Sequence, residues 1–145
     1  MKRNSKQPLE IVIPIKMKDF KAGGDGAARI KQVLQKIGFP PDIIRRVAIA
    51  AYEAEMNIVI HSLGGEIKAT VSTDVITIIA RDYGPGIPDI ELAMQEGYST
   101  APREIQEMGF GAGMGLPNIR RCADRMTVES KQGQGTTITI EIYNR

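Results

Sequence analysis

The stretch from residue 75 to residue 87 constrains this chain more than any other part of it. Its apolar, β-branched start, residues 75–80, predicts a buried strand, and Asp82 and the turn residues Gly84-Pro85-Gly86 follow directly. A tight turn explains the glycines and the proline but not an acid at the end of a buried strand. A carboxylate placed there can accept a hydrogen bond from an exocyclic amine, and glycines let the backbone approach a flat base closely.

Bulk composition excludes several classes of protein. The chain has 145 residues, 42% of them hydrophobic and 25% charged, which predicts one globular domain with its own core. The net charge of +2 is too small to indicate nucleic-acid binding, and no apolar run approaches the roughly 20 residues of a membrane span. A single cysteine, Cys122, excludes an intramolecular disulfide and favours a cytoplasmic location. We expect residues 1–8 to be a flexible tail and residues 9–145 to form the domain.

Hydrophobic periodicity predicts an alternation of strands and helices along the domain. Strands are expected at 9–15, 66–71, 75–81, 126–130 and 136–143, and helices at 27–37, 41–62, 88–95 and 113–124. Pro14 places the first strand at a sheet edge, because proline cannot donate to a β-ladder. Residues 97–110 show little periodicity. This order favours an α+β fold, a two-layer sandwich of a mixed, mostly antiparallel sheet with helices on one face.

The second predicted helix carries Glu53, Asn57 and His61 at intervals of four, so the three side chains share one face. A carboxamide oxygen can ligate Mg²⁺, and a neighbouring carboxylate can orient or deprotonate a nucleophile. A Glu-x-x-x-Asn pair by itself is more often a solvated helix face. We expect His61 to cap the helix or pack against it. Glu55 lies about 200° around the helix from Glu53 and is expected on the surface.

A second glycine cluster contains Gly111, Gly113 and Gly115 and leads through Leu116 into the helix predicted from 113 to 124. It is not a Walker loop, because no Gly-Lys-Ser/Thr follows. It is not a dinucleotide fingerprint either, because no strand precedes it directly. The helix start behind it supplies unpaired N–H groups and a dipole that favours anions, so phosphate binding is one interpretation of the cluster.

Taken together and in this order, these segments resemble the motifs of the Bergerat-type ATP-binding fold. That superfamily includes gyrase, the heat-shock chaperone ATPase, histidine kinases and the MutL mismatch-repair protein. The resemblance covers residues 9–143. Its motifs are the N box Glu53-x-x-x-Asn57, the first glycine box Asp82-x-Gly84-x-Gly86-Ile87, the second glycine box Gly111-x-Gly113-x-Gly115-Leu116, and the closing Gly135-Thr136.

Within the superfamily, the chain is most similar to the small bacterial anti-sigma-factor serine/threonine kinases, and residues 96–100 resemble the stressosome switch kinase. A sensor histidine kinase would need a dimerisation helix, for which residues 1–8 leave no room. Gyrase-like ATPases would need a second domain. The resemblance implies an ATP-dependent kinase that phosphorylates a small anti-anti-sigma (STAS-like) protein. The alternative is a nucleotide-gated switch that holds a sigma factor or a phosphatase without transferring phosphate. A homodimer through the first strand and sheet edge is also implied.

The resemblance also implies a role for each motif residue. Asp82 would accept the adenine amino group, with Gly84, Gly86 and Ile87 lining the base and Thr136 supporting Asp82 through water. Asn57 would bind Mg²⁺, and Glu53 would be the general base toward a serine hydroxyl. The remaining assignments are phosphate binding by Gly111, Gly113, Gly115 and Leu116 beneath a mobile lid at 99–110. This lid is longer than the family pattern, and Glu55 adds a charge beside the N box.

Two basic pairs, Arg45-Arg46 and Arg120-Arg121, stand outside these motifs. Such pairs are usually solvated helix faces. Contact with an acidic partner or a phosphate is the alternative interpretation.

Overall fold

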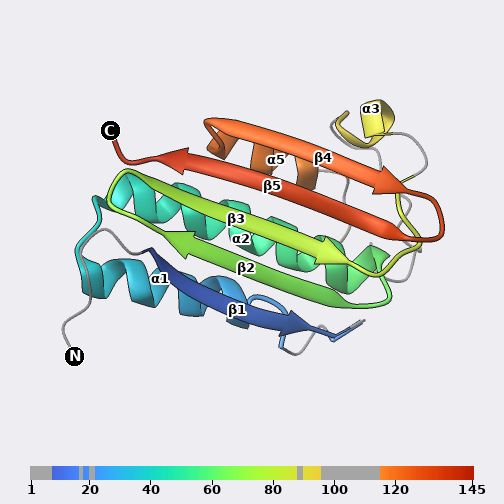
Figure 1. Ribbon diagram of the computed structural model, residues 1–145, viewed down its shortest axis with the longest axis horizontal. Helices are drawn as coiled ribbons and strands as arrows, with labels where there is room; N and C mark the ends of the chain where they lie inside the picture. The colour runs from blue at the N-terminus through green and yellow to red at the C-terminus, as the bar shows by residue number, and fades with distance from the viewer. Residues whose placement is uncertain (1–7, 17, 20–21, 88–89, 96–114) are drawn as a thin grey trace.

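The computed structural model describes residues 8–16, 18–19, 22–87, 90–95 and 115–145. Its elements follow the predicted order (Figure 1). They are β1 (Leu9–Ile15), α1 (Asp25–Ile37), α2 (Pro41–His61), β2 (Gly65–Val71), β3 (Val75–Asp82), α3 (Ile90–Ala93), α5 (Gly115–Cys122), β4 (Arg125–Lys131) and β5 (Gly135–Tyr143). Residues 1–7 of the predicted tail and the predicted lid lie outside the described residues.

The strands form one sheet in the order β1-β2-β3-β5-β4, with β1 at an edge as Pro14 predicted. Each pairing among the described strands is antiparallel, so the sheet is simpler than the mixed one expected from sequence. The helices α1, α2 and α5 cover one face, which confirms the predicted two-layer α+β architecture (Figure 1). β3 lies at the centre of the sheet, and its last residue, Asp82, reaches one end of the molecule.

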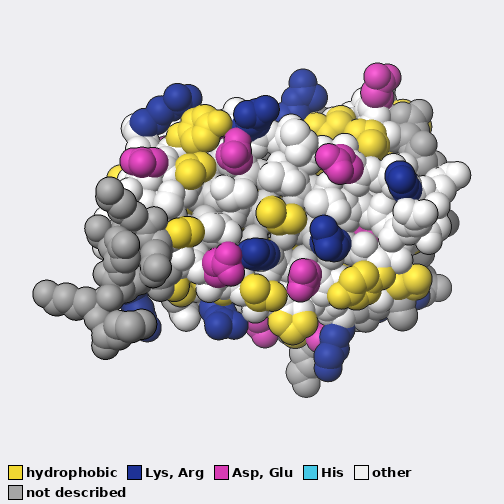
Figure 2. Space-filling model, viewed as in Figure 1, with side chains coloured by type: hydrophobic (Ala, Val, Ile, Leu, Met, Phe, Trp, Pro, Cys, Tyr) yellow, Lys and Arg dark blue, Asp and Glu magenta, His cyan; other side chains and the backbone are white. Residues whose placement is uncertain are grey.

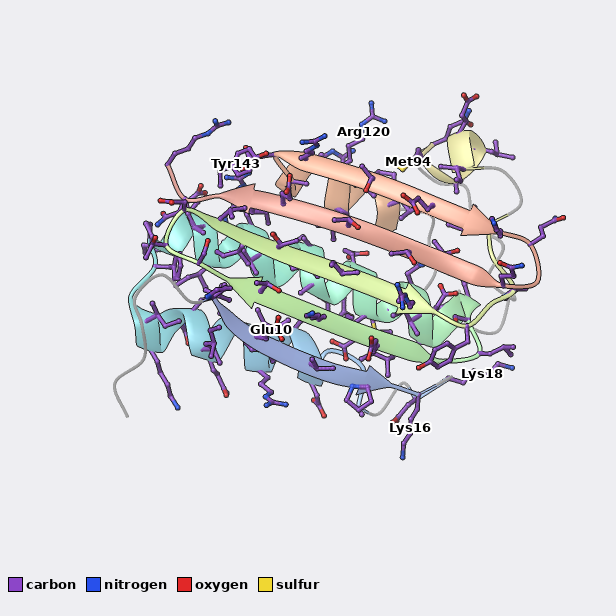
Figure 3. The ribbon with its side chains drawn as sticks, viewed as in Figure 1. Glu10, Lys16, Lys18, Met94, Arg120 and Tyr143 are labelled. Carbon is purple, nitrogen blue, oxygen red and sulfur yellow. The ribbon has the colours of Figure 1, made fainter. Side chains whose placement is uncertain are left out.

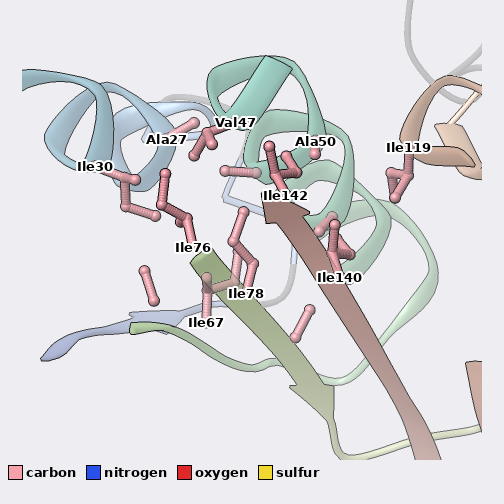
Figure 4. Packing of buried hydrophobic residues seen from close by; sticks show 14 of the residues in the cluster. Ala27, Ile30, Val47, Ala50, Ile67, Ile76, Ile78, Ile119, Ile140 and Ile142 are labelled. Atoms are coloured by element: carbon pink, nitrogen blue, oxygen red, sulfur yellow. The ribbon is translucent and has the colours of Figure 1, made fainter. Parts of the chain in front are cut away.

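The core lies between the sheet and these helices (Figure 4). Along β5, the side chains of Ile138, Ile140 and Ile142 are buried, whereas the intervening side chains face away from the helices, as the alternation in the sequence predicted. Each fully buried isoleucine stabilises the fold by about 1.5–3 kcal/mol. α2 contacts both α1 and α5 and therefore forms the middle of the helical layer. Within the described ranges, no helix combines the length and apolar composition that a membrane span requires.

Helix ends follow from local sequence. α1 ends at Gly38, whose positive φ of 98° lets its amide donate to the Leu34 carbonyl at 3.0 Å. α2 begins at Pro41, where the missing N–H costs nothing. α1 has no proline in its first turn, and its N-cap residue, Gly24, offers no side-chain cap. The amides at the start of α1 therefore need another acceptor.

The other face of the sheet carries interspersed charged, polar and apolar side chains (Figure 2). Lys68 and Glu10 form an ion pair at 3.4 Å across β1 and β2, and Glu10 and Tyr143 mark opposite parts of this face (Figure 3). Pairs this exposed contribute little to stability.

Candidate functional site

Asp82 is held rigidly at the end of β3. Its side chain is 8% exposed, and Oδ1 accepts hydrogen bonds from the Gly84 and Thr136 amides, each at 3.0 Å. Burial raises the pKa of Asp82, and hydrogen bonds from Gly84, Thr136 and Ser62 lower it in part. Because a carboxylate has about four acceptor positions, this one retains capacity for one further donor. A fixed, desolvated acceptor of this kind suits an exocyclic amine.

Backbone crowding explains two of the glycines around Asp82. Gly86 has a φ of 95°, and a Cβ there would lie 2.7 Å from the Lys131 carbonyl oxygen at the end of β4. Gly135 has a φ of 124°, and its Cβ would collide with the Asp82 carbonyl oxygen. The first glycine box is therefore pressed against the turn between β4 and β5. Gly86 is required by this close approach whether or not a base also lies against it.

Ser130 joins these two segments, and sequence reasoning missed it. Its hydroxyl oxygen accepts the Ile87 amide at 2.6 Å and lies 3.0 Å from the Thr136 hydroxyl. Thr136 also reaches Asp82 directly, because its amide donates to Oδ1, and the water-mediated support that the resemblance implied stays a prediction. The signal was present in β4, where Ser130 follows Met126 and Val128 on the half-buried face and breaks their apolar alternation.

The N box meets the start of α5. Glu53 is half-buried on α2, and its Oε1 accepts a hydrogen bond from Asn118 Nδ2 at 3.5 Å. A Cβ on Gly115 would lie 3.3 Å from Glu53 Oε2, so the second glycine box ends against this carboxylate. Burial raises the pKa of Glu53, and the Asn118 hydrogen bond lowers it in part. Nothing in the sequence pattern singled out Asn118.

Asn57 and His61 continue the face that Glu53 begins. Both are half-buried, at successive turns about 6 Å apart along the axis. Burial lowers the pKa of His61 and so favours its neutral form. Just beyond, the Leu63 amide donates to the Gly84 carbonyl and the Tyr83 amide donates to the carbonyl of Gly64, each at 3.0 Å. The N-box face therefore runs toward the first glycine box.

The expectation that Glu55 lies on the surface was wrong. Its side chain is 2% exposed and accepts hydrogen bonds from the amides of Gly24 at 2.8 Å, Ala27 at 2.9 Å and Gly26 at 3.4 Å. These are the uncapped N–H groups at the start of α1, where a negative charge is favourable. A helical wheel shows which face Glu55 occupies, but not that α1 covers this face.

The described residues contain only part of the second glycine box. Gly111 and Gly113 lie outside them, so their assignment to phosphates stays a prediction. Gly115 begins α5, and Leu116 beside it is buried in the core. The structure thus places Gly115 beside Glu53, and the α2 face that carries Glu53 and Asn57 runs toward the turn that follows Asp82.

Comparison with known proteins agrees with this geometry. The profile of the histidine kinase-, DNA gyrase B-, and HSP90-like ATPase family matches residues 42–144. The serine/threonine-protein kinase RsbT of Bacillus subtilis (strain 168) is 34% identical over 112 residues, which cover 74% of this chain and 78% of the relative.

Two further relatives are anti-sigma F factors. The one from Thermoanaerobacter sp. (strain X514) is 36% identical over 105 residues, covering 69% of this chain and 70% of the relative. The one from Geobacillus stearothermophilus is 32% identical over 106 residues, covering 69% of each chain. The predicted superfamily is confirmed, and the chain belongs to the histidine kinase-, DNA gyrase B-, and HSP90-like ATPase family.

Proposed function

We propose that this chain is an ATP-dependent serine/threonine protein kinase whose substrate is a small regulatory protein of the anti-anti-sigma (STAS-like) type. The observation that carries the proposal is the position of Glu53. Its half-buried carboxylate lies against Gly115 at the start of α5, where the second glycine box delivers a helix N-terminus. A base beside an anion-binding helix start is the arrangement that phosphoryl transfer to a hydroxyl requires.

The residues of the site fit a magnesium nucleotide. Asp82 offers a buried, oriented acceptor to the adenine amino group, with Gly84, Gly86 and Ile87 beside it. Asn57 offers a carboxamide oxygen, a ligand that Mg²⁺ accepts. When bound, the nucleotide supplies the phosphoryl group.

Glu53 acts on the substrate hydroxyl. Its Oε atoms accept the serine proton as the oxygen attacks, so the carboxylate must be ionised beforehand. Burial raises the pKa of Glu53, which makes it a stronger base once ionised. Asn118 donates to Oε1 and so keeps the ionised form populated and oriented. Catalysis then rests on positioning and electrostatics.

Names of the relatives support the substrate class. One relative is called a serine/threonine-protein kinase and others are called anti-sigma factors, which suit a kinase in a sigma-factor regulatory circuit. A cytoplasmic location and pairing of two chains along the β1 edge belong to the same proposal. The name anti-sigma F factor also favours the alternative, a nucleotide-gated switch that holds a sigma factor or activates a phosphatase without transfer.

Replacement of Glu53 by alanine tests the kinase and separates it from the switch. The protein is mixed with labelled ATP, Mg²⁺ and candidate partner proteins. We expect Glu53→Ala to bind ATP like the wild type and to lose label transfer about 10²- to 10⁴-fold. Glu129→Ala, on the exposed face of β4, is the matched control and should transfer normally.

Two results count against the proposal. Undiminished phosphorylation of the partner by Glu53→Ala would reject Glu53 as the base. ATP-dependent co-elution of the wild type with a partner that acquires no label would reject the kinase and support the switch.

A further inference from the structure

We propose that a hollow between α2 and α5 binds an acidic side chain of the protein substrate, about three or four residues from the serine that is phosphorylated. This inference rests on the proposed kinase function and specifies how its substrate would be recognised. It accounts for basic residues to which the nucleotide site gives no role.

The hollow has a volume of about 280 Å³ and opens to solvent. Three side chains of each helix line it: Arg45, Arg46 and Ile49 of α2, and Asn118, Arg121 and Cys122 of α5. None of these six side chains is acidic. A carboxylate entering the hollow would therefore meet positively charged guanidinium groups, and that of Arg45 could donate two parallel hydrogen bonds to it after leaving Asp42.

The arginines differ in how firmly they are held. Arg46 belongs to the framework, because its Nε donates to the Cys122 carbonyl at 2.9 Å and its guanidinium pairs with Asp124 at 3.1 Å. Arg45 pairs at 2.9 Å with Asp42, but both side chains are more than 60% exposed. Exposed pairs of this kind contribute about 0–1 kcal/mol, so a substrate carboxylate can replace Asp42 at little cost.

Asn118 connects the hollow to Glu53. Its Nδ2 donates to Glu53 Oε1 at 3.5 Å, and its Oδ1 accepts a hydrogen bond from Arg121 at 2.9 Å. One side chain thus touches the base and lines the hollow. A substrate that reaches Glu53 with its serine passes directly over this residue.

Helix geometry sets the spacing. Arg45, Ile49 and Glu53 are four residues apart and share one face of α2, so Arg45 lies about 12 Å from Glu53 along the axis. An extended peptide advances about 3.3 Å per residue. A serine at Glu53 therefore places the residue three or four positions away at Arg45. This spacing suits a side chain of the same substrate segment, if that segment runs extended along α2.

Charge reversal at Arg45 tests the proposal, with the partner protein that the wild type labels most strongly as the probe. We expect Arg45→Glu to raise the KM for that partner about tenfold, with kcat within about twofold and the Kd for ATP unchanged. Exchange of the substrate's acidic residue for lysine should restore the KM of Arg45→Glu. Asp42→Ala breaks the same ion pair but keeps Arg45, and should leave the KM equal or lower.

Arg120→Ala provides a second control, because Arg120 is exposed on α5 outside the lining and projects past the β4 edge (Figure 3). An unchanged KM for Arg45→Glu, or a substrate without an acidic residue within five positions of the phosphorylated serine, would overturn the inference. So would a parallel loss of ATP affinity, which would assign the hollow to the nucleotide.

Failure of the kinase function would look different. If the wild type labels no partner, the KM cannot be measured. In its place, calorimetry measures the affinity of the ATP-loaded protein for a partner that co-elutes with it. A tenfold loss with Arg45→Glu then supports the hollow as a docking site, and equal affinities reject it.

Discussion

Replacing Asp82 with asparagine separates recognition of the base from the stability of the fold. In the structure, Asp82 Oδ1 accepts the Gly84 and Thr136 amides. An asparagine oxygen can accept both bonds in the same place, so Nδ2 must occupy the position of the second carboxylate oxygen. That position changes from an acceptor to a donor, and it is the one available to a ligand amine.

The two consequences differ in size. Loss of a hydrogen bond to a charged acceptor costs about 1.5–3 kcal/mol. In Asp82→Asn, the Nδ2 donor also faces the amino group of the base, so both donors are left without an acceptor. A total of about 2–4 kcal/mol corresponds to a rise in the Kd for ATP of about 30- to 700-fold. The free energy of unfolding should change by less than about 1 kcal/mol, because both backbone bonds persist, the Ser62 hydroxyl can turn to accept from Nδ2, and a buried carboxylate no longer has to be desolvated.

Calorimetry with ATP and GTP, together with urea unfolding, measures both consequences. Guanine presents an acceptor oxygen where adenine presents its amino group. The wild type should therefore prefer ATP, and Asp82→Asn should narrow or invert this preference. Asp74→Asn, in the exposed turn between β2 and β3, is the control and should change neither affinity.

Two outcomes would refute the reasoning. An Asp82→Asn protein that binds ATP as tightly as the wild type would show that the carboxylate does not contact the base. A loss of ATP binding together with a large fall in the free energy of unfolding would assign Asp82 a structural role instead.

Two further substitutions test the environment of the N box. Asn118→Ala removes the hydrogen bond that lowers the pKa of Glu53, so this pKa should rise further. The acid limb of the pH profile of kcat/KM should then move to higher pH, and its alkaline plateau should change little. An acid limb at the same pH as in the wild type would contradict this. Glu55→Gln weakens three hydrogen bonds at the start of α1 and should lower the free energy of unfolding by about 2–4 kcal/mol in urea. Glu129→Gln is the control and should change the free energy of unfolding by less than about 0.5 kcal/mol. Equal urea midpoints for Glu55→Gln and Glu129→Gln would show that the buried carboxylate of Glu55 does not stabilise the fold.

Local sequence patterns predicted most of the fold, because each of these patterns is compatible with only one arrangement of its segment. The alternation of β5 requires one buried face, and Pro14 confines β1 to an edge. The helix predicted from residue 27 begins two residues earlier, at Asp25, because its first amides are satisfied from α2 and not by a local cap. The sequence around α1 contains no trace of that distant acceptor.

The site was predictable where its residues are adjacent in sequence. Asp82, Gly84 and Gly86 lie within five positions of the sequence, so they can be recognised together as one turn motif. Ser130 and Asn118 have partners far away in sequence: Ser130 bonds to Ile87 only because β4 meets the first glycine box, and Asn118 bonds to Glu53 only because α5 meets α2. Contacts between segments far apart in the chain depend on how the layers pack.

Glu53 and Glu55 have identical side chains but different contacts, because they face different helices. About 200° of helix rotation separates them, so Glu53 faces α5 and Glu55 faces the start of α1. A rotation of α2 about its axis that withdrew Glu53 from Gly115 would also withdraw Glu55 from the three amides that it satisfies. Because those amides would be left buried and unpaired, the rotation is costly. The carboxylate of Glu55 therefore fixes the orientation in which Glu53 faces Gly115.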